Sequence, residues 1–474
     1  METRPISPET WAKLPPEVQA YILVLENALR QSLERIAQLE QRVNELEARL
    51  NRHSGNSSQP PSQDPPQAPK NSREKSGRNP GGQPGYQGNH RELVPPEKVN
   101  KIVEHRAETC PHCRSALAHA AARPAPPMER HQVWELPEIH PVITEHRLVA
   151  GWCSHCQSWV KPELPVEIGR TAFGPRLHAW MAILTGRFRQ SRRQVMELLQ
   201  ELCGVSVSLG SIQSLCEETS EALAVPYREA KEAVAQAEMA HLDETGWKKK
   251  GKRRWLWVAV TRLATVFLVS CSRGRQALRE LIGESFQGIL QSDRWGAYNM
   301  VDPSQRQICW AHLKRDFQAL SERKTRAGPL GAWGLREIKR LFAVWHRYEA
   351  GKISWADMQW ELVPVRTRLG ASCGDPKAEA LCRNLLKLWP ALLTFAMVPG
   401  AEPTNNRAER ALRGAVLWRK GCFGNQSENG SRFTASILTA VATLRQQDRN
   451  IVEYVVAAIH AHRTGQPVPS LLPV

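Results

Sequence analysis

Mostly apolar residues recur every seven positions near the start of the chain. One series holds Ile22, Leu29, Ile36, Val43 and Leu50, and the other holds Leu25, Ser32, Leu39 and Leu46. This heptad pattern predicts a coiled-coil arm over residues 1–52, and branched residues in the first series with leucine in the second favour a parallel two-stranded coil. Arg35 would then face Glu40 of the other chain, and Arg42 would face Glu47. The alternative is one amphipathic helix packed on its own protein.

Apolar residues are scarce over residues 53–98, where Ser, Gln, Pro, Gly and basic residues dominate. Such a segment buries too little apolar surface to offset the entropy of ordering, so it predicts a flexible, disordered linker. Its basic residues could bind DNA phosphates, or they could simply keep the tether solvated. These residues are Lys70, Arg73, Lys75 and Arg78.

Strand-like apolar patterns follow in HQVWELPEI and ITEHRLVAGW, within residues 99–168. Two CxxC pairs flank them, Cys110 with Cys113 and Cys153 with Cys156. Two such pairs can complete a four-thiolate shell, so the segment predicts a structural Zn²⁺ module with two long strands, of the zinc-ribbon type. A redox motif would need only one pair at a helix start. His112 and His155 are alternative ligands or exposed residues of the knuckles.

Helical spacing of apolar residues marks residues 169–235. The stripe consists of Val195, Leu198, Leu199 and Leu202, then breaks at Gly204 and resumes at Ile212 and Leu215. Ser206 or Ser208 can cap the second helix, so the segment has the form of a DNA-binding helix-turn-helix. The second helix carries Ser208, Ser211, Gln213 and Ser214 but no arginine, which makes ordinary helix packing an equal alternative.

Short apolar strands alternate with helices after residue 236. The predicted strands are 239–243, 255–261, 264–270, 288–292 and 306–310, and the predicted helices are 274–284 and 312–320. This order is that of a ribonuclease-H-like α/β core, built from residues 236–320 and 398–440. A mostly helical insertion (321–397) interrupts it, and a C-terminal helix and tail (441–474) follow. The whole chain is therefore predicted to be a multidomain α+β protein.

Three acidic residues occupy notable places in that order. Asp243 and Asp293 each end a predicted strand, and Glu409 falls in the first turns of a helix that Asn405 or Asn406 can cap. The first and fourth strands of such a core are neighbours, so the two aspartates would meet. Three carboxylates suit two Mg²⁺ (or Mn²⁺) ions, which could act on a phosphodiester. Each acid alone would be interpreted as a turn or cap residue, and only the joint placement favours a site.

Lys and Arg outnumber Asp and Glu by 64 to 47, which gives a formal net charge of +17. Such a balance favours a polyanionic partner, double-stranded DNA above all. Basic residues near the acids could contact backbone phosphates, although a charged hairpin tip is also normal surface. They are Lys248, Lys249, Lys250, Lys252, Arg253 and Arg254 in the tip, and Arg407, Arg410 and Arg413 beside Glu409.

The insertion is rich in tryptophan. We interpret these side chains as core or interface anchors rather than platforms for stacked bases. They are Trp333, Trp345, Trp355, Trp360 and Trp389.

The first residues lack the apolar core of a signal peptide, and no apolar stretch is long enough to span a bilayer. We therefore expect a cytoplasmic protein with reduced thiols and no membrane partner. Outside the CxxC pairs the thiols are scattered and are interpreted as small core hydrophobes. They are Cys203, Cys216, Cys271, Cys309, Cys373, Cys382 and Cys422.

Four strings carry a family resemblance: HLDETGW, QSDRWGAY, CWAHLKRDF and NNRAERALRGAVLWRKGCF. They resemble bacterial insertion-sequence transposases of the family named for insertion sequence 66. The GGQPGYQG string, the twin CxxC pairs and the leucine-rich N-terminus also occur in that family's order. The resemblance implies a DDE transposase of the bacterial nucleoid, in which Asp243, Asp293 and Glu409 hold the two ions. Water would free a 3′-hydroxyl at the element's end, and that hydroxyl would attack target DNA.

The chain departs from the DDE pattern at one position. Many DDE enzymes carry a basic residue seven positions after the glutamate, where this chain has Val416, so Arg419 or Lys420 are the candidates for that DNA contact. The part after Ser431 also follows the family less closely. Two other functions stay open: a non-catalytic, zinc-containing DNA-binding regulator with a degenerate nuclease fold, and a coiled-coil scaffold for other element-encoded proteins.

Overall fold

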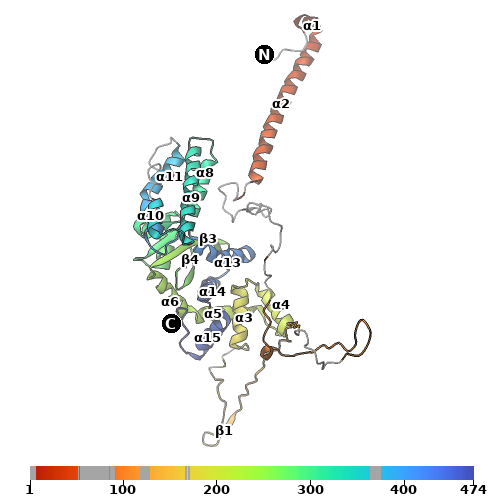
Figure 1. Cartoon of the computed structure of the whole chain (residues 1–474), viewed down its shortest axis with the longest axis vertical. Coiled ribbons are helices and arrows are strands. Elements are labelled where there is room, and N and C mark those ends of the chain that lie inside the picture. The colour runs from red at the N-terminus through yellow and green to blue at the C-terminus, as the bar shows by residue number, and fades with distance from the viewer. Residues whose placement is uncertain are drawn as a thin grey trace.

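The computed structural model describes residues 7–51, 53, 64, 85, 91–117, 129–165, 168, 171–362 and 375–473. Its centre is a mixed sheet of five strands: β3 (Met239–Lys249), β4 (Lys252–Val260), β5 (Thr265–Ser270), β6 (Ile289–Ser292) and β7 (Arg306–Ile308). Their order in the sheet is β5-β4-β3-β6-β7. The first three form an antiparallel meander, whereas β3 pairs with β6, and β6 with β7, in parallel. The chain is therefore a mixed α/β protein around this sheet (Figure 1).

β3 is longer than the sequence pattern predicts. It continues past Asp243 to Lys249 because these residues stay in register with β4 as far as Lys252. Trp247 within this extension is buried and packs edge-on against Trp418. The prediction that Asp243 ends its strand is therefore wrong: Asp243 lies in mid-strand, just beyond the part of β3 that pairs with β6.

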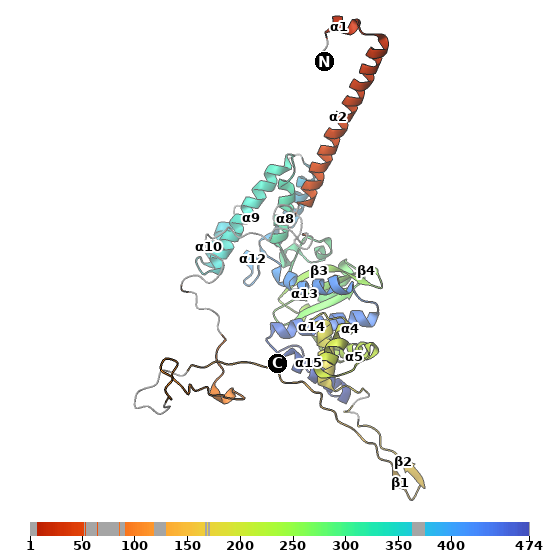
Figure 2. The same ribbon diagram turned by 90° about the vertical axis from the view of Figure 1, so that its right-hand side faces the viewer.

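The two faces of the sheet are covered by different helices. Leu242 and Trp257 belong to the large core that includes α7 (Arg275–Ile282), the connection from β5 to β6. Leu256 and Val258, at the alternate positions, pack on the opposite side against α13 (Asn406–Cys422). This alternation follows from the period of two in a strand, and it places α13 against one face of the sheet, with Leu438 and Ala442 of α14 beside it (Figure 2).

The helix α14 (Glu428–Gln446) protects the edge strand β5. The hydroxyl of Thr439 accepts a hydrogen bond from the backbone N–H of Phe267 at 2.9 Å, and that of Thr443 accepts from Thr265 at 3.0 Å. These contacts satisfy backbone donors that an edge strand would otherwise leave without partners. The segment after Ser431, whose role was doubtful from the sequence, is thus part of the central body.

The helical segment packs into that same body. It consists of α3 (Pro175–Gly186), α4 (Arg192–Cys203), α5 (Leu209–Ala222) and α6 (Ala224–Ala235). Gly204 ends α4 in the left-handed conformation, and the Ser208 side chain caps α5, one of the two predicted caps. Helix α5 contacts α3, α14 and α15 (Ile451–Thr464), and its Ile212 and Leu215 are buried. This burial supports ordinary helix packing for the second helix of the pair.

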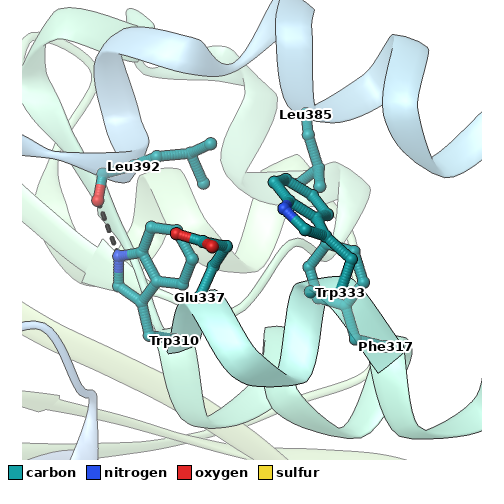
Figure 3. A pocket seen from close by; sticks show the side chains of 7 residues that line it. Trp310, Phe317, Trp333, Glu337, Leu385 and Leu392 are labelled. Atoms are coloured by element: carbon teal, nitrogen blue, oxygen red, sulfur yellow. Dashed lines mark hydrogen bonds between the residues drawn. The ribbon is translucent and has the colours of Figure 1, made fainter. Parts of the chain in front are cut away.

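The insertion has its own hydrophobic core. It comprises α9 (Ala327–Glu349), α10 (Trp355–Leu362), α11 (Pro376–Lys387), the 3-10 turn η8 (Trp389–Leu392) and α12 (Thr394–Met397), and it packs on α8 (Trp310–Ser321). Figure 3 shows a small pocket in this core, where Trp333 lies beside Phe317 and the indole N–H of Trp310 donates to the Leu392 carbonyl at 2.7 Å. Trp345 is also buried, whereas Trp360 is 81% exposed and anchors nothing in the core.

The N-terminal arm is a single long helix. After the short α1 (Pro8–Ala12), α2 (Pro16–Leu50) extends away from the sheet in both views (Figures 1 and 2). Its predicted seam residues from Leu25 to Leu50 are exposed, Leu29 by 62%. The structure therefore does not pack this helix on its own protein. Most of the linker predicted at 53–98 lies outside the described residues, with Lys70, Arg73, Lys75 and Arg78.

The segment with the CxxC pairs differs from its prediction. Its described residues form two short paired strands, β1 (Gly151–Cys153) and β2 (Ser158–Val160), and an isolated antiparallel bridge between Thr109 and Ala116, while the 3-10 turn η2 (Pro96–Lys98) precedes the segment. The two long strands predicted between the pairs are wrong, because residues 129–150 form no strand. Their apolar side chains have no neighbouring strand to pack on, and Val142 is 96% exposed. No helix in the described ranges is long and apolar enough to cross a membrane.

Candidate functional site

The parallel pairing of β3 with β6 aligns the two aspartates. Its last aligned residues are His241 and Gln291; two residues later, Asp243 lies within β3 and Asp293 lies just past the end of β6. The strand pairing that the sequence predicted is thus observed. Two short 3-10 turns, η4 (Gly296–Met300) and η5 (Pro303–Gln305), follow Asp293 and lead to β7. The site therefore lies where β6 ends and β3 continues.

Helix α13 brings Glu409 across the sheet. Asn405 stands at its N-cap position, but its side chain makes no capping hydrogen bond and instead donates to the Leu242 carbonyl. The predicted capping by Asn405 or Asn406 is therefore wrong, because the amide is used to tie the helix start to β3. Ala408 and Leu412 pack the same turn onto β3 and β4. This attachment holds Glu409 over the strand that carries Asp243.

The three acids influence one another electrostatically. Burial raises the pKa of Asp243 well above its usual range, and the charges of Glu244, Asp293 and Glu409 raise it further. Burial also raises the pKa of Glu409, with Arg315 opposing and Asp293 adding to the shift. Such shifts are typical of carboxylates that are buried close to one another.

Each aspartate uses one oxygen for a local backbone contact. Asp243 Oδ1 accepts from the N–H of Glu244 at 2.9 Å, and Asp293 Oδ1 accepts from the N–H of Trp295 at 2.8 Å. The buried guanidinium of Arg306 donates to the Asp293 carbonyl at 3.3 Å. These contacts fix both carboxyl groups and leave the second oxygen of each for another ligand.

Sequence reasoning missed Glu244, the neighbour of Asp243. Its carboxylate is buried and paired with Arg273 Nε at 2.9 Å, and it accepts a hydrogen bond from the Tyr298 hydroxyl at 2.6 Å. Arg273 in turn lies over the ring of Trp295. Because consecutive residues of a strand point to opposite faces, Glu244 is directed away from α13. The HLDETGW string contained both acids, and only the strand alternation distinguishes them.

A second cluster also escaped the sequence analysis. Ligand atoms of Cys309, His312 and Glu409 lie within 4.8 Å of one another, a closeness that the three predicted acids do not reach as a group among the described residues. Burial lowers the pKa of His312 to about 4 and raises that of Cys309 to about 11. The sequence signal for this cluster was the CxxH spacing in CWAH. It was missed because Cys309 was interpreted as one of the scattered core thiols.

The predicted DNA-binding residues fall into two groups. Most are exposed on the β3–β4 hairpin tip and along α13, namely Lys248, Lys250, Lys252, Arg253, Arg410, Arg413 and Lys420, with Arg254 half-buried. Three others are engaged within the protein. Lys249 pairs with Glu428, Arg407 pairs with Glu402 at 2.8 Å, and Arg419 donates to Thr245 Oγ1 at 2.9 Å and to the Gly246 carbonyl.

The hairpin tip is held in place by the loop after α13. The N–H of Lys250 donates to the Asn425 carbonyl at 2.9 Å, and the N–H of Asn425 donates to Lys248 at 2.9 Å. Gly424 has a φ of +108°, and a Cβ there would lie 2.2 Å from the Lys248 carbonyl oxygen. Only glycine fits this approach. The basic tip is therefore fixed to the end of α13.

The two CxxC pairs stay apart. Cys153 and Cys156 sit at the β1–β2 turn, where the Cys156 N–H donates to Cys153 Sγ at 3.4 Å. Hydrogen bonds from Ser115 and Cys110 lower the pKa of the exposed Cys113 thiol to about 7, and backbone N–H groups of Cys156 and His155 lower that of Cys153. One thiol of each pair, Cys113 and Cys153, thus loses its proton more readily than an ordinary thiol. Among the residues that the structure describes, the four thiols do not form one cluster.

Among the described residues, no cysteine forms a disulfide. The interpretation of scattered thiols as core residues holds for Cys216, Cys309 and Cys382, which are buried, but it is wrong for Cys271, which is exposed. Cys373 lies outside the described residues.

Comparison with known proteins gives the family. A family model described as "Transposase IS66 family" matches residues 170–432, more than half of the chain, and one described as "Family of unknown function (DUF6444)" matches residues 13–92. Two relatives from Sinorhizobium fredii (strain NBRC 101917 / NGR234) are uncharacterized proteins. The protein y4hP is 26% identical over 62% of this chain and 61% of its own length, and y4qI is 24% identical over 51% and 50%. The chain thus spans less than two thirds of either relative. Because the first family model covers the sheet, both aspartates and Glu409, the chain belongs to the IS66 family of transposases.

Proposed function

We propose that the protein is a DDE transposase that cuts the ends of an insertion sequence and joins them to target DNA. In this proposal the sheet and α13 form a ribonuclease-H-like core, and Asp243, Asp293 and Glu409 are its catalytic acids. The observation that carries the proposal is their shared environment: burial raises the pKa of Asp243, and the charges of Asp293 and Glu409 raise it further. Residues from β3, the end of β6 and α13 thus share one electrostatic site.

The donor set fits two divalent cations such as Mg²⁺ or Mn²⁺. The three side chains offer carboxylate oxygens, which these hard cations prefer, and Glu409 Oε1 is buried without a hydrogen bond in the described part of the chain. When bound, such ions supply the charge that activates an attacking oxygen and stabilises a leaving one. The role of the chain is to hold the carboxylates on rigid elements, because β3 and α13 are tied together at Asn405.

The reaction has two phosphodiester steps. In the first, water attacks the phosphodiester at the element's end, and the released strand carries a 3′-hydroxyl. In the second, that hydroxyl attacks a phosphodiester of target DNA and displaces another 3′-oxygen. The exposed basic residues Lys252, Arg410 and Arg413 contact the DNA backbone in this proposal, since Arg410 and Arg413 lie along α13 and Lys252 lies at the hairpin tip.

Two further parts of the proposal concern the arm and the thiols. The exposed seam of α2 pairs with a second copy of the chain, so the active protein is a dimer or larger assembly. The four thiols Cys110, Cys113, Cys153 and Cys156 take up a structural Zn²⁺ once the segments that carry them come together. Double-stranded DNA is the principal partner, and other element-encoded proteins are a second class of partner.

The test uses purified full-length protein, DNA carrying the repeats that flank the gene, and Mn²⁺ or Mg²⁺. We expect strand-specific nicks at the element's ends, and we expect Asp243→Asn, Asp293→Asn and Glu409→Gln each to reduce cutting by at least about 100-fold. DNA binding should persist in all three variants. The matched control is Asp302→Asn, which changes an exposed aspartate that caps η5. Normal cutting by Asp243→Asn would show that the assignment of the acids is wrong.

A further inference from the structure

Cys309 and His312 are brought together by the start of α8. β7 ends at Ile308, Cys309 is the N-cap residue of α8, and His312 lies in its first turn. Cys309 is buried, and its sulfur accepts a hydrogen bond from the backbone N–H of Asn405 at 3.2 Å. That contact attaches the start of α13 to the start of α8. As a result, Glu409 in the first turn of α13 reaches the same place.

Three buried polar atoms at the starts of α8 and α13 have no hydrogen-bond partner within the described ranges: His312 Nδ1, Asn405 Oδ1 and Glu409 Oε1. Of these, His312 Nδ1 and Glu409 Oε1 lie 3.5 Å apart, within ion-pair distance but without the geometry of a hydrogen bond. Buried polar atoms in native proteins normally have a partner, so an unpartnered pair directed at one point calls for an explanation. A cation held between the two atoms would satisfy both.

The distances suit a small tetrahedral ion. With metal–ligand bonds of 2.0–2.2 Å, two ligands of a tetrahedral Zn²⁺ lie about 3.4 Å apart. The observed separation of 3.5 Å between His312 Nδ1 and Glu409 Oε1 agrees with that value. The sulfur lies within 4.8 Å of the other two ligand atoms, and a longer edge is expected for it because Zn–S bonds are longer.

We propose that Cys309, His312 and Glu409 form a binding site for a thiophilic divalent metal ion, Zn²⁺ in the first instance. One sulfur, one nitrogen and one oxygen ligand select Zn²⁺ or Co²⁺ over Mg²⁺, which avoids thiolate. The Cys309 thiol gives up its proton to solvent when the metal–sulfur bond forms. Three protein ligands leave a fourth position for water or another donor. This site is distinct from the CxxC pairs, since it lies between α8 and α13.

The site has a regulatory consequence that rests on the proposed function. Glu409 belongs both to this cluster and to the proposed set of catalytic acids. An ion bound by Cys309 and His312 would therefore draw Glu409 away from Asp243 and Asp293. Zn²⁺ at concentrations that fill the cluster is expected to inhibit Mg²⁺-dependent DNA cutting.

Cobalt spectroscopy tests the binding directly. The full-length chain carries serine in place of Cys110, Cys113, Cys153 and Cys156, so that these thiols contribute no signal, and Co²⁺ alone is titrated. We expect a near-ultraviolet thiolate-to-cobalt band and visible bands of tetrahedral cobalt, saturating at one ion per chain. Cys309→Ser removes the ultraviolet band, and His312→Gln weakens Co²⁺ binding by at least about tenfold. The control Cys271→Ser, at an exposed cysteine, retains both signals.

Two results would overturn the site: no thiolate band at any Co²⁺ concentration, or a band that persists in Cys309→Ser. Circular dichroism establishes that each variant is folded. If Cys309→Ser does not fold, His312→Gln decides, and unchanged Co²⁺ affinity in that variant rejects the proposal.

A cutting assay with Mg²⁺ tests the consequence. The ratio of rates without and with Zn²⁺ is expected to fall from at least about 10 in the parent chain to about 1 in Cys309→Ser. A chain that never cuts DNA contradicts the proposed transposition chemistry, while the cobalt spectrum still decides the metal site. Cutting that Zn²⁺ inhibits equally in both chains rejects the regulatory role.

Discussion

Asp243 and Glu244 are neighbours in sequence, yet their side chains are directed to opposite faces of the sheet and have different surroundings. Glu244 is directed into the core beneath β3, where Arg273 and Tyr298 satisfy its carboxylate. Asp243 is directed toward α13; burial raises its pKa, and the charges of Glu244, Asp293 and Glu409 raise it further. Glu244 contributes to the structure of the strand. Asp243 lowers the stability of the fold, which agrees with the catalytic role that we propose for it.

This cost gives a prediction about stability and pH. In metal-free buffer at pH 8, the free energy of unfolding of Asp243→Asn is expected to exceed that of the parent by about 1 kcal/mol, so the variant unfolds at a higher temperature. The folded-state pKa of Asp243 is raised, so its stabilising protonated form is fully present below the unfolded pKa and is lost as pH rises through the folded pKa. The advantage of the variant should therefore shrink as pH falls toward 4. Thermal unfolding at both pH values, followed by circular dichroism, measures it.

Asp302→Asn is the control of opposite sign. Hydrogen bonds from Ser304 lower the pKa of Asp302, so its charged form is favoured in the folded protein. Its replacement should lower stability at pH 8 and not raise it. Equal effects of the two substitutions would contradict the view that Asp243 is destabilised by its neighbours.

Among the elements, the strands of the central sheet were the most predictable from sequence. Their short apolar runs are local features of the sequence, buried on both faces in β5 and β7, and so is the order in which they follow one another. The end of β3 was not predictable, because Trp247 is fixed by Trp418, a contact with a helix far along the chain. The hydrogen bond from the Asn405 side chain could not be predicted either, because its acceptor is the carbonyl of Leu242, far away in the sequence. The juxtaposition of Cys309 with Glu409 required the packing of α13 against α8.

The edge of the sheet gives a prediction at the level of one helix. Thr439→Val and Thr443→Val remove the hydroxyls that accept from the N–H groups of Phe267 and Thr265. Each variant should lose about 1–3 kcal/mol of stability, because a buried donor is left without a partner while the side chain keeps its shape. Unfolding in urea measures the loss. Thr464→Val is the control, since its hydroxyl bonds only to carbonyls of its own helix α15, and it should change stability little.

The arm gives a second prediction at this level. If α2 pairs with a second copy, Leu39→Glu places a charge in the seam and should shift the protein toward monomer, by at least about tenfold in dissociation constant. Light scattering coupled to size-exclusion chromatography measures the mass. Gln38→Glu adds the same charge outside the seam and should leave the assembly intact. A parent chain that is already monomeric at micromolar concentration would contradict the pairing.

Over the whole molecule, segments distant in sequence form one body around the sheet. The helices α3 and α5 share a core with α14 and α15, and the loop after α13 fixes the β3–β4 hairpin tip. The net charge of +17 is a property of the whole chain, but the exposed basic residues near the site lie along one helix and the adjacent hairpin tip. Arg410 and Arg413 lie along α13, and Lys420 leads to the hairpin tip. This arrangement provides a basic path from Glu409 to Lys252.

The basic path gives a prediction about binding as a function of salt. Each phosphate contact contributes a slope of about 0.9 to the fall of log affinity with log salt. Lys252→Gln and Arg413→Gln should each weaken DNA binding on any sequence and reduce the slope by about 1, which fluorescence anisotropy at several salt concentrations measures. Arg262→Gln removes the same charge at the β4–β5 turn, at the opposite end of β4 from the hairpin tip, and should leave the slope unchanged. If all three variants changed the slope equally, the attraction would belong to the net charge of the molecule, and the path along α13 would have no special part in holding DNA over the acids.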